Sequence, residues 1–164
     1  MLFLTALNSR LSRWVMYLAS LSLVGLLVFV IYGVVMRYVF NNAPPYVEQL
    51  ALLLVISVAM FGASAGVRDA GHIGLDSLVD LLSPQMQKSC KVLVYLLSIL
   101  FAISLFVGGI EMAISTFNNT IPTLGVSESL RYVPVISAGV LITLFSIEHI
   151  FAIFHSVKVI PSWH

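Results

Sequence analysis

WVMYLASLSLVGLLVFVIYGVVM, residues 14–36, contains no charged side chain, and this stretch decides the fold class. A helix needs about 20 apolar residues to cross a hydrocarbon layer about 30 Å thick. Three further runs carry at most one Asp, Glu, Lys or Arg each: residues 49–67, 92–117 and 133–157, the last of which also contains His149 and His155. Only helices and closed barrels satisfy their backbone groups in lipid, and the alternating polarity of barrel strands is absent. The sequence therefore predicts an all-α membrane protein with four long, tilted transmembrane helices.

The composition argues against a soluble domain, a nucleic-acid partner and cysteine chemistry. Apolar residues make up 60% of the 164 residues and charged residues 9%, whereas a soluble domain carries about a quarter charged residues. The net charge of +1 gives no reason to expect a nucleic-acid partner. Cys90 is the only cysteine, which excludes an intrachain disulfide or a CxxC redox centre. No catalytic constellation is visible, so we expect a single membrane domain, residues 1–164, that is not an enzyme.

The distribution of basic residues predicts the orientation. We place the spans at about residues 14–39, 45–68, 85–117 and 130–157, after a short basic lead formed by residues 1–13. Six basic residues then share the side of the amino terminus: Arg10, Arg13, Arg68, Lys88, Lys91 and Lys158. Only Arg37 and Arg131 fall on the other side. Because basic residues collect in cytoplasmic loops, both termini are predicted to be cytoplasmic.

One segment between spans two and three is predicted to lie flat at the cytoplasmic interface. Within about residues 74–83, apolar side chains follow the i, i+3, i+4, i+7 pattern of an amphipathic helix: Leu75, Leu78, Val79 and Leu82. Asp76 and Asp80 occupy the other face. An acidic face suits an anionic leaflet poorly, so we expect protein contacts to hold this helix, through Lys88, Lys91 or basic residues of a partner.

Span two carries two features that favour contacts. Glu48 lies in its first turn, where the helix dipole stabilises a carboxylate. Either this stabilisation or a contact with another protein would explain a glutamate at this position. Gly62 and Gly66 form a G-x-x-x-G, which lets two helices approach closely in lipid. The motif predicts a packing site, either within the chain or against a partner.

Two acids, Glu111 and Glu148, interrupt the apolar runs, and an ionisable group costs about 2.5–3.5 kcal/mol at the middle of a membrane. Glu111 lies about 30 Å along the third span from Lys91, near the outer interface. Glu148 lies in the inner half of span four, so we expect no mutual contact. A salt bridge or an interfacial position, an ion or proton pathway, and contact with a partner subunit all remain open for both acids.

Haem is excluded by the positions of the histidines. His149 and His155 share one span six residues apart and point in different directions, whereas membrane cytochromes pair histidines from different helices. His72 falls in a loop. We expect no cofactor and no metal in this chain.

The order of the polar landmarks along the whole chain resembles the small membrane subunit of tripartite ATP-independent periplasmic (TRAP) transporters. These landmarks are Arg37-Tyr38, the aromatic-x-acid pair Tyr46 and Glu48, Arg68 with Gly71-His72-Ile73, Pro122-x-Leu124-Gly125-Val126, and Arg131-Tyr132-x-Pro134. Two positions depart from the family pattern. Gln49 stands where a second glutamate is common, and Ser127 stands where a proline often follows.

The resemblance implies a function. Such a subunit pairs with a large membrane subunit that holds the substrate and sodium sites and moves as an elevator. A soluble periplasmic protein delivers the solute, and the small subunit is a static scaffold in the bacterial inner membrane. Overall similarity favours sialic-acid systems, and sodium is expected in the partner.

The side chains expected to contact partners on this view are Arg37, Tyr46, Glu48, Gly62, Gly66, Arg68, His72, Asp76, Asp80 and Arg131. The alternative hypothesis is an autonomous small oligomeric transporter or channel that uses Glu111 or Glu148 as its titrating site.

Overall fold

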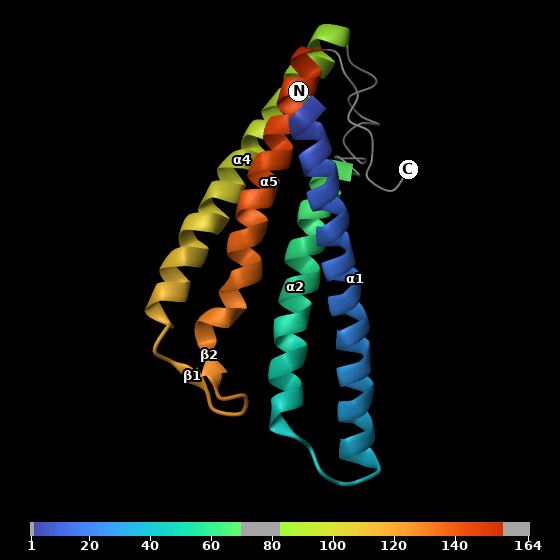
Figure 1. The fold of residues 1–164 in the computed structure, drawn as a ribbon, viewed down its shortest axis with the longest axis vertical. Coiled ribbons are helices and arrows are strands. Elements are labelled where there is room, and N and C mark those ends of the chain that lie inside the picture. Colours follow the sequence, from blue (N-terminus) through green and yellow to red (C-terminus); the bar gives the residue numbers. More distant parts are fainter. Residues whose placement is uncertain (1, 70–82, 156–164) are drawn as a thin grey trace.

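Four long helices dominate the structure, a computed structural model that describes residues 2–69 and 83–155 (Figure 1). They are α1 (Leu2–Tyr38), α2 (Pro45–Asp69), α4 (Pro84–Ser115) and α5 (Val133–Phe154). In the described part of the chain, all four are long and apolar enough to cross a membrane. The prediction of four helices with the length and hydropathy of membrane spans is confirmed.

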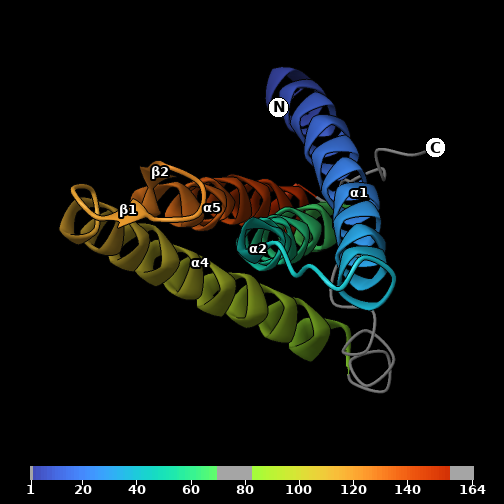
Figure 2. The same ribbon diagram turned by 90° about the horizontal axis from the view of Figure 1, so that it is seen from below.

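The helices form two hairpins. The first pairs α1 with α2 and the second pairs α4 with α5, while α2 also packs against α5. The hairpins lie close together at the end that holds the amino terminus and diverge toward the other end (Figure 1). Viewed along the bundle, α2 lies between α1 and the α4–α5 hairpin (Figure 2).

The first helix begins earlier than predicted. Residues 2–13 continue α1 without a break, so the basic lead is helical and forms the start of the first long helix. This segment contains neither glycine nor proline, and the side chains of Asn8 and Ser12 are buried. Tertiary contacts of these polar groups therefore extend a helix whose hydropathy alone would start it later.

The connection between α4 and α5 is folded rather than extended. β1 (Thr120–Ile121) pairs antiparallel with β2 (Val126–Ser127), and Gly125 adopts a positive φ of 66° in the turn between them. Ser127 caps the following 3₁₀ helix η1 (Glu128–Tyr132) by accepting a hydrogen bond from the backbone N–H of Ser129. The predicted fourth span from residue 130 therefore begins with a 3₁₀ turn.

A close helix approach occurs at Gly139, outside the predicted G-x-x-x-G. A methyl group added at Gly139 would lie 2.8 Å from the carbonyl oxygen of Ala102, so α5 touches the α4 backbone there. At Gly62 and Gly66, an added methyl group would meet none of the described atoms within 4 Å. The G-x-x-x-G therefore makes no seam with the described residues, and its packing against a partner stays a prediction.

The predicted interfacial helix of residues 74–83 lies outside the described residues except for Ser83. His72, Asp76 and Asp80 also lie outside them, and their predicted roles remain predictions.

Candidate functional site: a buried ionic cluster and contacts at the opposite ends of the helices

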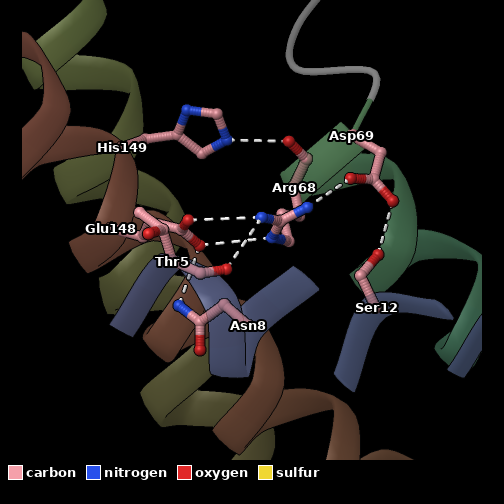
Figure 3. A network of polar contacts seen from close by, with 7 residues as sticks. All are labelled: Thr5, Asn8, Ser12, Arg68, Asp69, Glu148 and His149. Carbon is pink, nitrogen blue, oxygen red and sulfur yellow. Dashed lines mark hydrogen bonds and ion pairs between the residues drawn. The ribbon is translucent and has the colours of Figure 1, made fainter. Parts of the chain in front are cut away.

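The strongest polar feature is an ion pair between α2 and α5 (Figure 3). It lies at the end where the two hairpins are close together (Figure 1). Arg68, in the last turn of α2, places Nε 3.2 Å from Oε2 and Nη2 3.3 Å from Oε1 of Glu148 on α5. Its Nη1 lies 2.7 Å from Oδ1 of Asp69. The three side chains are only 2%, 3% and 0% exposed. One guanidinium thus contacts two buried carboxylates.

The first helix supplies further donors to these carboxylates. Asn8 Nδ2 donates to Glu148 Oε2 at 2.8 Å, and Ser12 Oγ donates to Asp69 Oδ2. The backbone carbonyl of Thr5 accepts from Arg68 Nη2 at 3.5 Å. Residues three, four and seven apart share one face of a helix, so this part of α1 presents Thr5, Asn8 and Ser12 together to the cluster (Figure 3).

An imidazole connects the cluster to α4. His149 Nε2 lies 2.9 Å from the backbone oxygen of Arg68, and because a carbonyl only accepts, Nε2 carries the hydrogen. The imidazole ring also stacks on the aromatic ring of Tyr95 on α4, with centroids 4.7 Å apart and planes 5° from parallel. The cluster therefore joins all four long helices: α1, α2, α4 and α5.

The charge balance explains why α1 is needed. With both carboxylates ionised, Arg68 neutralises only one of Asp69 and Glu148. A buried charge is tolerated when hydrogen bonds satisfy the remaining lone pairs. Asn8 and Ser12 provide such bonds, one to each carboxylate. We conclude that the cluster holds the helices together. Of the three roles considered for Glu148, the structure shows the salt bridge.

Glu111 lies elsewhere. It is exposed near the end of α4, beside the β1–β2 connection, whereas Glu148 lies near the end of the antiparallel α5. The two acids are thus at opposite ends of the hairpin, as expected.

The predicted outer contact residues of the first hairpin meet each other. Arg37 Nη2 lies 2.9 Å from Glu48 Oε1, with side chains 55% and 72% exposed. The hydroxyls of Tyr32 and Tyr46 lie 3.1 Å apart. These contacts tie the end of α1 to the start of α2 while leaving the ion pair on the surface.

Arg131 joins η1 to the first hairpin. Its Nη1 lies 2.9 Å from Glu128 Oε1, and its Nη2 donates to Oε1 of Gln49 on α2. Gln49 is the position that departs from the family pattern described above. The amide oxygen takes the place that a carboxylate oxygen would occupy there.

Replacing Gln49 with glutamate is expected to stabilise the protein by about 0.5 kcal/mol, which corresponds to a rise in melting temperature of about 1–2 °C. The reason is that a carboxylate would accept the Arg131 hydrogen bond with charge assistance. Thermal unfolding of the purified chain in mild detergent measures the effect. The same substitution combined with Arg131→Gln is the control for the added charge, and an equal rise in both backgrounds would contradict the Arg131 explanation.

Together, these features define the class: a multi-pass membrane protein whose buried ionic groups hold its helices together. A family model described as "Tripartite ATP-independent periplasmic transporters, DctQ component" matches residues 26–155. The chain belongs to this family, the small permease subunits of TRAP transporters.

Individual relatives agree with this assignment. Two Haemophilus influenzae proteins, both provisionally named TRAP transporter small permease protein, are 23% and 26% identical. The matches cover 76% and 83% of this chain, and 75% and 83% of those proteins. A third protein of that species, the sialic acid TRAP transporter permease protein SiaT, is 32% identical over 68% of this chain but only 17% of its own length.

Proposed function

We propose that this chain is the scaffold subunit of a TRAP importer, and that it braces a large membrane subunit without itself carrying solute. The buried cluster supports this role most directly. Both carboxylates of the cluster, Asp69 and Glu148, are bonded to Arg68 and to α1 donors. A transported ion would have to displace these bonds, and doing so would separate the helices.

The expected partner is a large permease subunit. The match to SiaT covers only 17% of that protein, so most of that permease lies outside the matched region. A chain that corresponds to such a small part would function beside a separate, larger subunit. The exposed apolar side chains on α1, such as Leu21, Leu27 and Ile31, supply surface for lipid or for that subunit.

The substrate proposal follows from the same relative. Its name is that of a sialic-acid permease, and we propose sialic acid as the solute of this transporter. Sodium coupling and elevator movement would belong to the large subunit, in the bacterial inner membrane, with a periplasmic binding protein delivering the solute. The small chain would need no cofactor. Its exposed Arg37–Glu48 pair and β1–β2 connection lie at the end that would face that binding protein.

Coexpression tests the proposal. An affinity tag on this chain is expected to retain the large subunit from the same transport system through purification in mild detergent. Cells that lack their own sialic-acid uptake should accumulate labelled sialic acid only with both membrane subunits and the binding protein, and only with sodium outside. Uptake that persists after deletion of this chain would contradict the scaffold role.

The two glycines of α2 give a residue-level test of the partner contact. Gly62→Leu and Gly66→Leu are expected to leave the melting temperature of the isolated chain within about 2 °C of wild type, because no described atom lies where the new side chains would begin. If the large subunit packs there, capture of that subunit should fall about tenfold or more. Gly108→Leu on α4, which also meets no described atom within 4 Å, is the control. Unchanged capture in both α2 variants would remove this face from the interface.

A further inference from the structure

A groove opens between α4 and α5 at the end of the hairpin where α4 begins and α5 ends. Its volume is about 470 Å³. Its lining residues are Lys88, Ser89, Val92, Leu93, Leu96, Ile153 and Phe154. The groove is separate from the ionic cluster, since none of these residues belongs to that cluster.

The polarity of the groove changes along its length. Lys88 and Ser89 lie in the first turns of α4, and the other five lining residues are apolar. Leu96 follows Lys88 by eight residues, which is about 12 Å along a helix. The groove is thus cationic at its mouth and apolar along the rest of its length, and this order suits a molecule with an anionic head and a hydrocarbon tail.

The charge at the mouth is not neutralised by the described part of the chain. Lys88 forms no ion pair among residues 2–69 and 83–155. The carboxylates of Asp69 and Glu148, the acids that lie at this end of the described structure, are bonded to Arg68 instead. An ammonium group beside apolar side chains therefore favours an anionic group from outside these residues.

We propose that this groove binds one anionic phospholipid, with its phosphate at the Lys88 ammonium and an acyl chain along Val92, Leu93 and Leu96. Basic pockets between membrane helices on the cytoplasmic side are typical sites for anionic headgroups. Lys88 is one of the six basic residues that predict this end to be cytoplasmic. The inference depends on the chain spanning a membrane and is independent of the transport role.

Photolabelling in nanodiscs tests the site. The full-length chain is reconstituted with a trace of phosphatidylglycerol that carries a photoactivatable acyl chain, and the labelled peptides are mapped by mass spectrometry. The label is expected on the α4 peptide that contains Val92, Leu93 and Leu96. Lys88→Gln should lower it about fivefold, since one basic residue near the surface contributes that much. Ser89→Phe, which keeps the charge but fills the mouth, should lower it similarly.

The controls separate this site from general attraction and from other occupants. Arg13→Gln removes a positive charge from exposed α1 at the same end and should leave the label unchanged. An equal loss with Arg13→Gln, or equal labelling by a phosphatidylcholine probe, would overturn the proposal. So would competition by soluble glycerol phosphate, because a lipid site needs the acyl chain.

Two protein occupants are tested in the same assay. If the predicted interfacial helix of residues 74–83 covered the groove through its acids, the double variant Asp76→Asn with Asp80→Asn would raise labelling several-fold. If the large subunit covered it, coexpression would abolish labelling. Either result would contradict the lipid site, whereas labelling that is unchanged in both experiments supports it.

Discussion

Replacing Arg68 with methionine is expected to lower the free energy of unfolding by about 3–5 kcal/mol, the cost of breaking a buried ion pair by removing one partner. The side chain of Arg68 is 2% exposed and contacts both Glu148 and Asp69. Methionine fills a similar volume but removes the guanidinium that both carboxylates contact. Unfolding of the purified chain in detergent, followed by circular dichroism, measures the loss.

The chain offers a matched control. Arg37→Met breaks an arginine–glutamate pair of similar length, but the side chains of Arg37 and Glu48 are 55% and 72% exposed. Exposed pairs contribute about 0–1 kcal/mol, so this variant should stay close to wild type. Equal losses in both variants would contradict the account of a buried, structural cluster.

A second variant tests the charge balance within the cluster. Glu148→Gln keeps an oxygen that can accept from Asn8 and leaves Arg68 paired with Asp69. It should therefore cost less than Arg68→Met, by at least about 1 kcal/mol. A larger loss for the glutamine variant would show that Glu148, rather than Arg68, is the centre of the network.

Adding a single methyl group at Gly139 is expected to have the second large effect. The new Cβ would lie 2.8 Å from the carbonyl oxygen of Ala102 and 3.0 Å from the backbone nitrogen of Phe106. Backbone atoms cannot rotate away, so α4 and α5 must separate. Overpacking of this kind costs about 1–3 kcal/mol for Gly139→Ala, and Gly139→Leu should prevent recovery of folded protein.

The control for this prediction is a glycine in the facing helix. At Gly108 an added methyl group meets no described atom within 4 Å. Gly108→Ala should therefore leave the free energy of unfolding unchanged or raise it by about 0.5–1 kcal/mol, because alanine favours a helix more than glycine does. The same unfolding measurement applies. If the two alanine variants lost equal stability, the close approach at Gly139 would not be what limits packing.

The sequence predicted the helices better than their contacts. Hydropathy identifies the four spans because each apolar run is long, and α2 begins at Pro45, where the second span was predicted to start. The early start of α1 at Leu2 was not predicted because residues 2–13 contain polar side chains. Asn8 and Ser12 are buried only through contacts with other helices. Periodicity assigns a residue to a face but does not choose its partner.

The candidate site shows the same limit. Arg68 and Glu148 are 80 residues apart, and either could have paired with other charges at its predicted depth. The spacing of Gly62 and Gly66 predicted a packing site on α2. The close approach of α5 to the α4 backbone is instead at Gly139, which belongs to no such motif. A signal was nevertheless present: the polar side chains of residues 1–13 and an acid of span four were both predicted to lie on the cytoplasmic side.

The central claim is that the chain stabilises a larger transporter and moves no solute itself. Proteoliposomes that contain only this chain should accumulate no labelled sialic acid above protein-free liposomes under an inward sodium gradient, with the periplasmic binding protein present. Liposomes with the same chain and the large subunit should accumulate it. Sodium-dependent uptake by the chain alone would contradict the account.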